Sequence, residues 1–155
     1  MIFRGIEPSD NDFLENIANN ILKPIYGSQK KAMEEWWIGG GFKNTFIATV
    51  KREGVDCCVG FLSLKDNPKK SYLKISTLVI ADEKSRGCGY GVYLLEKAEK
   101  FAKEREYSRM VVTVSEEKKD AISFFVRSGF VVIREILGKY RPGIKEVILK
   151  KILRA

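Results

Sequence analysis

Leu78 to Val92 reads LVIADEKSRGCGYGV. Its first residues are apolar, as in a strand that is buried on both faces, and residues 86–91 form a glycine-rich turn. An amphipathic helix is predicted directly after this turn. The first N–H groups of a helix have no intrahelical partner and lie at the positive end of its dipole, and glycine lets the backbone approach a ligand closely. The segment therefore predicts a site for a phosphate or pyrophosphate group.

Three kinds of phosphate-binding loop compete for this segment. A P-loop requires Gly-Lys-Ser/Thr after a longer spacer, which this segment lacks. A Rossmann fingerprint counted from Gly87 would need glycine at Val92, and the wider chain is not a run of βαβ units. The pattern that fits is Arg-x-x-Gly-x-Gly, formed by Arg86, Gly89 and Gly91. A plain glycine-rich turn between a strand and a helix stays the alternative.

The hydrophobic periodicity on both sides of this segment predicts an α/β (α+β) fold in one domain, residues 1–155. We expect a single mixed, mostly antiparallel sheet with helices on both faces, and a central strand over residues 72–80. The first helix is expected to stop at Pro24, and glycines 39–41 to end the second. The expected order is strand 2–7, helices starting at Ser9 and at Ser28, strands 44–51, 55–64 and 72–80, helix 89–105, strand 110–114, helix 117–127, and strands 130–136 and 145–152.

The composition narrows the classes of function. The chain has no histidine, which excludes hydrolases that depend on Ser–His or Cys–His pairs, and without a CxxC pair no metal site is expected. The net charge of +8 allows nucleic-acid binding, but the lysines are interleaved with glutamates, as on a solvated surface. The sequence has no apolar run of membrane-spanning length and does not start like a signal peptide. A cytoplasmic protein with no membrane partner is therefore expected.

The glycine-rich segment and its neighbours resemble the GNAT superfamily of acetyl-CoA-dependent N-acetyltransferases. Residues 59–62 (VGFL) are similar to a strand segment of that family, and residues 121–130 (AISFFVRSGF) to its second cofactor-binding helix, A-x-x-x-Y-x-x-x-G-F. The resemblance covers about residues 44–152 and implies that acetyl-CoA is the co-substrate, with its pantetheine arm along the strand and its diphosphate on the turn. The cofactor-binding residues that it implies are Leu78, Val79, Ile80, Arg86, Gly87, Cys88, Gly89, Tyr90, Gly91, Lys118, Ala121, Phe125 and Arg127.

Two positions depart from the family pattern. Phe125 stands where the family often has a tyrosine that can protonate the departing thiolate, and Lys118 stands where an asparagine is common. Tyr140, in the connection between the last two strands, is the candidate for a substitute acid, and its alternative is an ordinary turn tyrosine. Glu83 and Glu116 are the candidate bases, with solvated carboxylates as the alternative.

The resemblance predicts an enzyme that moves an acetyl group directly from acetyl-CoA to a primary amine of a small molecule, a peptide or a protein. Trp36, Trp37 and Tyr26 would form an aromatic wall of the acceptor site if they face inwards. A non-catalytic acyl-CoA-binding sensor is the alternative from another class, and a basic nucleic-acid-associated protein is a third. A homodimer stays open.

Overall fold

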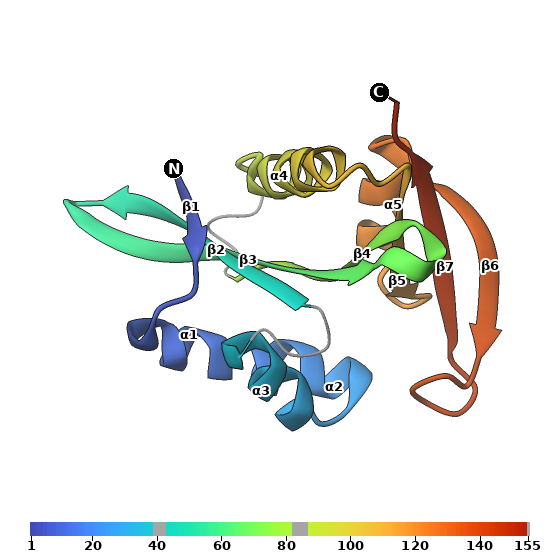
Figure 1. Ribbon diagram of the computed structural model, residues 1–155. Coiled ribbons are helices and arrows are strands. Elements are labelled where there is room, and N and C mark those ends of the chain that lie inside the picture. Colours follow the sequence, from blue (N-terminus) through green and yellow to red (C-terminus); the bar gives the residue numbers. More distant parts are fainter. Residues whose placement is uncertain (39–42, 82–86, 155) are drawn as a thin grey trace.

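One sheet organises the molecule. The structure, a computed structural model, describes residues 1–38, 43–81 and 87–154. Within these residues the strands follow the order β1-β2-β3-β4-β5-β7-β6 (Figure 1), and only the β4–β5 pair is parallel. The strands are β1 Ile2–Gly5, β2 Lys43–Arg52, β3 Val55–Asn67, β4 Tyr72–Ile80, β5 Arg109–Ser115, β6 Val131–Leu137 and β7 Lys145–Ile152. The expected mixed, mostly antiparallel sheet with a central β4 is confirmed.

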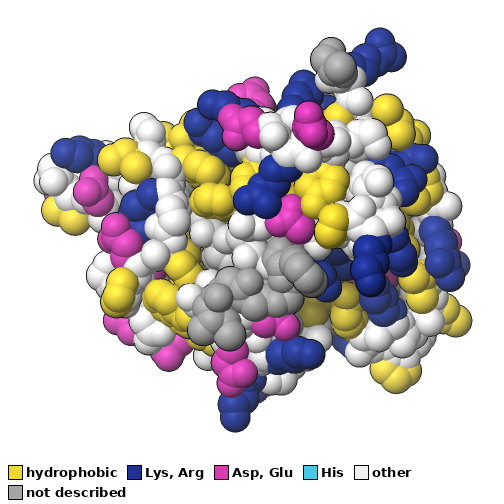
Figure 2. All heavy atoms as spheres, viewed as in Figure 1, with side chains coloured by type: hydrophobic (Ala, Val, Ile, Leu, Met, Phe, Trp, Pro, Cys, Tyr) yellow, Lys and Arg dark blue, Asp and Glu magenta, His cyan; other side chains and the backbone are white. Residues whose placement is uncertain are grey.

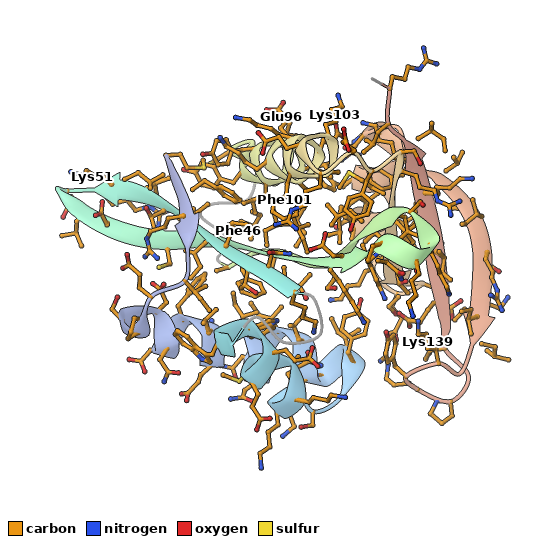
Figure 3. The ribbon with its side chains drawn as sticks, viewed as in Figure 1. Phe46, Lys51, Glu96, Phe101, Lys103 and Lys139 are labelled. Atoms are coloured by element: carbon orange, nitrogen blue, oxygen red, sulfur yellow. The ribbon has the colours of Figure 1, made fainter. Side chains whose placement is uncertain are left out.

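Helices cover both faces of the sheet, as expected (Figure 1). One face carries α1 (Asn11–Asn16), α2 (Lys23–Tyr26) and α3 (Lys30–Ile38), and the other carries α4 (Tyr90–Glu104) and α5 (Lys119–Arg127). Each face has its own apolar core. On the α4 side, Phe46 of β2 and Phe101 of α4 point toward one another (Figure 3), with ring centroids 5.8 Å apart. The burial of these two cores holds the three layers together.

The first helical region does not stop at Pro24, contrary to the sequence prediction. A π-helical stretch, Ile17–Leu22, joins α1 to α2, and α2 carries Pro24 in its first turn. The Lys23 N–H donates to the Ala18 carbonyl, five residues earlier. The π-helical hydrogen bonds span five residues and end just before Pro24. Pro24 then lies in the first turn of α2, a position at which the missing N–H of proline costs little. The chain therefore stays helical as far as Tyr26.

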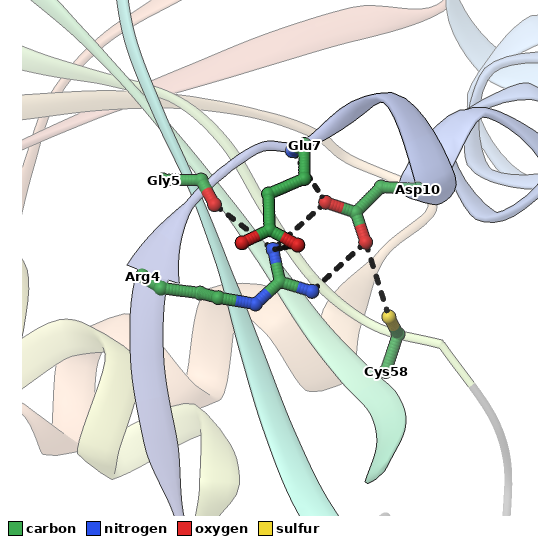
Figure 4. Close-up of polar contacts among 5 residues, drawn as sticks. All are labelled: Arg4, Gly5, Glu7, Asp10 and Cys58. Atoms are coloured by element: carbon green, nitrogen blue, oxygen red, sulfur yellow. Dashed lines mark hydrogen bonds and ion pairs between the residues drawn. The ribbon is translucent and has the colours of Figure 1, made fainter.

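A part-buried ion pair links β1 and β3 to the 3-10 turn Pro8–Asp10 that leads into α1 (Figure 4). The Arg4 guanidinium donates to both carboxylate oxygens of Asp10, at 2.8 and 2.9 Å. The same carboxylate accepts the backbone N–H of Glu7 at 2.7 Å and the thiol of Cys58 at 3.7 Å. The hydrogen bonds from Arg4 hold the pKa of Asp10 below its ordinary value, and burial raises the pKa of Cys58. These contacts fix the entry of the N-terminal helices onto the sheet.

The central strands β4 and β5 pair over part of their length and then diverge. Their pairing runs from Tyr72 with Arg109 to Ile75 with Val112, although β4 continues to Ile80. The β3–β4 register shifts at Ser76, between the pairs Leu64–Ile75 and Ser63–Thr77. Such a bulge bends its strand and increases its local twist. Among the described strands, residues 76–80 of β4 thus have no partner on the side facing β5, which opens the centre of the sheet.

The surface has no single charged band on the face that Figure 2 shows. Lys and Arg side chains are scattered there among acidic, apolar and other groups. In the described part of the chain, the helices are all too short or too polar to cross a bilayer.

Candidate functional site

A cavity opens where β4 and β5 diverge. It has a volume of about 570 Å³, a size typical of small-molecule and cofactor sites. Its walls come from β4, β5, the glycine-rich turn, the start of α4, one side of α5, and Ile21 to Tyr26 of the N-terminal helices. We call it the main cavity. Because the bulge at Ser76 separates the two strands, this cavity lies in the middle of the sheet.

The glycine-rich turn presents backbone N–H groups to the main cavity. Gly87 and Gly89 have φ angles of 76° and 81°, which favour glycine, and a Cβ built on either would meet no atom within 4 Å. The helix α4 begins after Gly89, and the N–H of Tyr93 donates to the Gly89 carbonyl at 3.0 Å. The three preceding helical N–H groups have no intrahelical partner, and Tyr90, Gly91 and Val92 all line the cavity. The open space and the unpaired donors fit a diphosphate.

Most of the sequence-predicted cofactor residues are brought together on the wall of the main cavity. Arg86 lies outside the described residues. Cys88 is exposed, and the wall next to it is formed by the neighbouring glycines. The predicted residues that line the cavity are Leu78, Val79, Ile80, Gly87, Gly89, Tyr90, Gly91, Lys118, Ala121, Phe125 and Arg127. Their role in binding a cofactor stays a prediction.

Phe125 contributes to the core more than to the cavity. It is only 5% exposed, and its ring centroid lies 5.1 Å from that of Phe124 and 5.2 Å from that of Phe130. Phe124, which the sequence did not single out, also lines the cavity and lies 3.3 Å from the position of a Cβ on Gly91. The first turn of α4 therefore packs directly against α5, and glycine at position 91 allows this approach.

A second cavity adjoins the main one between the sheet and the N-terminal helices. It has a volume of about 390 Å³. Five residues line both cavities, namely Leu22, Tyr26, Ser76, Thr77 and Thr113. The two cavities therefore meet at the bulge of β4. A ligand in one could contact a ligand in the other only at this junction.

Two tyrosines lie next to each other at the second cavity. Tyr26 lines both cavities and Tyr140 lines the second, and their rings form an edge contact with centroids 5.2 Å apart. Burial raises the pKa of both hydroxyls, and the charge of Glu146 raises them further. Both groups therefore keep their protons at neutral pH. The sequence singled out Tyr140 but treated Tyr26 as part of an aromatic wall.

The carboxylates that the sequence proposed as bases are not part of these walls. Glu83 lies outside the described residues, and Glu116 lines neither cavity. Glu146 of β7, which the sequence did not single out, is 1% exposed, and its Oε1 has no hydrogen-bond partner among the described residues. Burial raises the pKa of Glu146. Among the described residues, no group of three His, Cys, Asp or Glu side chains is arranged to hold a metal ion.

The two tryptophans pack in the core, which was the favoured alternative to an aromatic wall of the acceptor site. Trp36 is 3% exposed and its ring lies 4.6 Å from that of Phe61, in the core beneath the N-terminal helices. Trp37 packs against the same core. Of the three aromatic residues considered for the acceptor site, Tyr26 is the one that lines a cavity.

Several solved structures with this architecture are acetyltransferases. NAA60 from Arabidopsis thaliana, solved with a bisubstrate analogue, is 19% identical with a TM-score of 0.80, and 97% of each chain is covered. An aminoglycoside 6'-N-acetyltransferase complexed with coenzyme A is 15% identical with a TM-score of 0.73, covering 100% of this chain and 99% of the other. A putative streptothricin acetyltransferase from Bacillus anthracis str. Ames, in complex with acetyl coenzyme A, is 22% identical with a TM-score of 0.64. At these low identities the likeness shows a shared fold.

Coverage differs among these structures. The match to the streptothricin acetyltransferase covers 72% of this chain but only 63% of that one, so this chain spans less than two thirds of its length.

No curated protein matches the chain. The family model of the acetyltransferase (GNAT) family matches residues 11–130. Because this match runs from the N-terminal helices to the end of α5, the chain belongs to the acetyltransferase (GNAT) family.

Proposed function

We propose that this protein is an N-acetyltransferase that moves an acetyl group directly from acetyl-CoA to a primary amine. The observation that carries the proposal is the main cavity, where the unpaired edge of β4 leads to a glycine-rich turn with free helical N–H groups. The unpaired backbone groups of residues 76–80 suit an arm that contains amides. The N–H groups at the start of α4 suit the diphosphate of a nucleotide.

The second cavity is the site that we assign to the amine. It opens onto the main cavity at Ser76, Thr77 and Tyr26, so an amine held there reaches the end of the β4 edge. Acetyl-CoA supplies an activated acetyl thioester. Holding two reactants in a productive orientation contributes on the order of 7–11 kcal/mol in favourable cases. Binding in adjoining cavities is therefore expected to provide much of the catalysis.

We assign the role of proton donor to Tyr26. Tyr26 lines both cavities, and its hydroxyl carries a proton at neutral pH, as a general acid requires. Tyr140, the candidate from the sequence, lines only the second cavity and supports the Tyr26 ring through their edge contact. Among the described residues, the one carboxylate in the wall of the second cavity is Glu35, which is bound to Lys43 at 3.0 Å. We therefore assign the proton of the attacking amine to water in this cavity.

The loop assignment is tested by Gly89→Glu, with Gly54→Glu as its matched control. Both glycines have positive φ (81° and 78°) and open space around them, so the backbone strain of the two substitutions is similar. Gly54 lies in the β2–β3 turn, away from the cavity. We expect Gly89→Glu to abolish CoA binding measured by calorimetry, because it places a carboxylate where the diphosphate would lie. Gly54→Glu is expected to bind CoA like the unaltered protein.

Two results would count against the proposal. Equal CoA affinity of the Gly89→Glu and Gly54→Glu variants would refute the loop assignment. Binding of acetyl-CoA without release of free thiol in the presence of any amine would favour a sensor over an enzyme.

A further inference from the structure

Lysines form a ladder along one side of the second cavity. Lys43 of β2 lies directly opposite Lys65 of β3, and Lys65 lies directly opposite Lys74 of β4. All three line the cavity. Three neighbouring strands thus each present a cation to the same space between the sheet and the N-terminal helices.

Two further cations add to this charge, one in the wall of the cavity and one close to Lys74. Lys31 of α3 also lines the second cavity. Lys139, in the β6–β7 connection, extends toward the same side of the sheet as α2 (Figure 3), and its Nζ lies 5.4 Å from the ring centre of Tyr140. The one acidic residue in the described wall is Glu35, which Lys43 already binds at 3.0 Å. The cavity therefore has an excess of positive charge.

This arrangement is unfavourable for the empty protein. Like charges directly opposite each other on paired strands destabilise a sheet, and burial of an ammonium group disfavours its charged form. The pKa of Lys74 is lowered to about 8 by burial, and next by the charges of Lys139, Lys65 and Lys43. An anion bound among these lysines would offset both the repulsion between them and the cost of burying the ammonium group of Lys74.

We propose that the acceptor amine also carries a carboxylate or phosphate group, and that Lys65 and Lys74 bind this group in the second cavity. The proposal rests on the proposed function, because it assigns the second cavity to the acceptor. Hydroxyl groups of Ser28 and Ser76 in the same wall add neutral donors for the anion. The volume of about 390 Å³ fits a small molecule.

The geometry also positions the acceptor. The lysine ladder adjoins the junction with the main cavity, because Lys74 lies two residues before Ser76 on β4 and Ser76 lines both cavities. An amine whose anionic group binds the ladder thus holds its nitrogen within reach of the junction. An acceptor with further positive charges, such as a polyamine, would be repelled by the same lysines.

The first test compares matched amines as acceptors. Suitable pairs are glucosamine 6-phosphate with glucosamine, and 4-aminobutyrate with butylamine, with spermidine as a polycation. We expect kcat/KM to be at least tenfold higher for the anionic member of a pair, and this advantage to shrink as the salt concentration rises. Phosphate and carboxylate pairs are compared separately, so the preferred anion is identified. Equal rates within both pairs, or preference for spermidine, would overturn the proposal.

The second test uses variants of the ladder. Lys65→Gln and Lys74→Gln are expected to raise the KM of the anionic acceptor at least tenfold while leaving the KM of acetyl-CoA unchanged. Lys51→Gln and Lys103→Gln are the controls, because these lysines lie at the tip of the β2–β3 hairpin and on α4, away from the cavity (Figure 3). A loss of CoA affinity in Lys74→Gln would show that the ladder binds the co-substrate and would contradict the proposal.

A third measurement separates this proposal from the proposed function. Binding of inorganic phosphate, followed by calorimetry in the absence of CoA, requires no acetyl transfer. We expect saturable binding to the unaltered protein that is lost in Lys65→Gln and Lys74→Gln and kept in Lys103→Gln. Phosphate binding without any CoA binding would refute the acetyltransferase assignment alone. CoA binding with no saturable phosphate binding would refute the anionic acceptor alone.

Discussion

At the scale of single residues, the site depends on hydroxyl and ammonium groups whose ionisation is set by burial. Tyr26 and Tyr140 lie in edge contact beside Glu146, and burial raises the pKa of all three side chains. Burial lowers the pKa of Lys74. In each case the neutral form of the side chain is favoured, which is the expected effect of removing an ionisable group from water.

The role of Tyr26 is tested by comparing Tyr26→Phe with Tyr140→Phe. Both variants keep the ring–ring contact and remove one hydroxyl. We expect Tyr26→Phe to lower kcat by about 10²-fold, since general acid catalysis is typically worth ~10²–10⁴-fold, with little change in the KM of acetyl-CoA. Tyr140→Phe is expected to lower kcat by a smaller factor. A larger loss of kcat in Tyr140→Phe than in Tyr26→Phe would instead assign the role of general acid to Tyr140, the candidate from the sequence.

Lys74→Met should make the protein more stable while it impairs acceptor binding. Because the folded pKa of Lys74 is about 8 and the ordinary value is 10.5, the unfolded chain holds this proton more tightly. The loss of folding stability caused by burying the charged Lys74 is therefore complete below pH 8, and it disappears as the pH rises toward 10.5. We expect the variant to gain on the order of 2 kcal/mol in free energy of unfolding at pH 7, and less at pH 10.

Urea unfolding in phosphate-free buffer measures this difference. Lys103→Met is the control, because Lys103 is exposed on α4 and its replacement should change stability by less than about 0.5 kcal/mol. A Lys74→Met variant less stable than the unaltered protein at pH 7 would show that Lys74 has a stabilising partner.

At the scale of elements, the attachment of the N-terminal helices to the sheet depends on the Arg4–Asp10 pair (Figure 4). Asp10 is 3% exposed, and its neutralisation removes the hydrogen-bonded counter-charge of Arg4, which then has only the more distant Glu7 carboxylate at 3.8 Å. We expect Asp10→Asn to lower the free energy of unfolding by about 2–3 kcal/mol at pH 7, measured by urea unfolding. The control is Glu104→Gln, whose pair with Lys100 is exposed and should contribute less than about 0.5 kcal/mol.

The pH dependence of this pair has a defined sign. The pKa of Asp10 is lowered in the folded protein, chiefly by the hydrogen bonds from Arg4. The stabilisation by ionised Asp10 is therefore fully present above the pKa of about 4 in the unfolded chain. It is lost as the pH falls through the lower pKa of Asp10 in the folded protein. The stability difference between the protein and Asp10→Asn should narrow in acid. A difference that stays constant below pH 4 would contradict the assignment.

At the scale of the whole molecule, the main cavity joins parts of the chain that are far apart in the sequence. Residues of α2, β4, β5, α4 and α5 all line it. A ligand that binds there contacts elements on both faces of the sheet, and it must stabilise the folded state because the unfolded chain lacks the cavity. Acetyl-CoA at a hundredfold excess over its Kd should add about 2.7 kcal/mol to the free energy of unfolding.

The stabilisation by acetyl-CoA is measured as a rise in the melting temperature, Tm, in thermal unfolding. For a chain of this size, that gain corresponds to a rise in Tm of roughly 5–10 °C. The Gly89→Glu variant should show no such rise, and the Gly54→Glu variant should show all of it. An unchanged Tm of the unaltered protein with acetyl-CoA would argue against a binding site in the main cavity.

Much of the fold was open to prediction from local patterns. Strands were expected at residues 44–51 and 55–64, and Glu53 and Gly54 form the turn between β2 and β3 with φ angles of 52° and 78°, because short-range turn chemistry determines such hairpins. The alternation of strands and helices was likewise read correctly. The start of the first helical region was misjudged: a capping box joins Glu7 and Asp10 around the 3-10 turn Pro8–Asp10, which precedes α1, so the helical turn begins before the expected Ser9. Asp10 also accepts two hydrogen bonds from Arg4, a contact between residues of different elements that local patterns do not reveal.

The sequence by itself determined the order of strands and helices, the glycine-rich turn and the resemblance to an acyltransferase family. Each of these depends on neighbouring residues, whose periodicity and turn preferences act locally. The tertiary structure alone decided the rest. The π-helical turn before Pro24 places Tyr26 at the junction of the cavities, and strand register places Lys43, Lys65 and Lys74 side by side. These are relations between distant residues, set by which strands pair and in what register, and single-sequence patterns do not contain them.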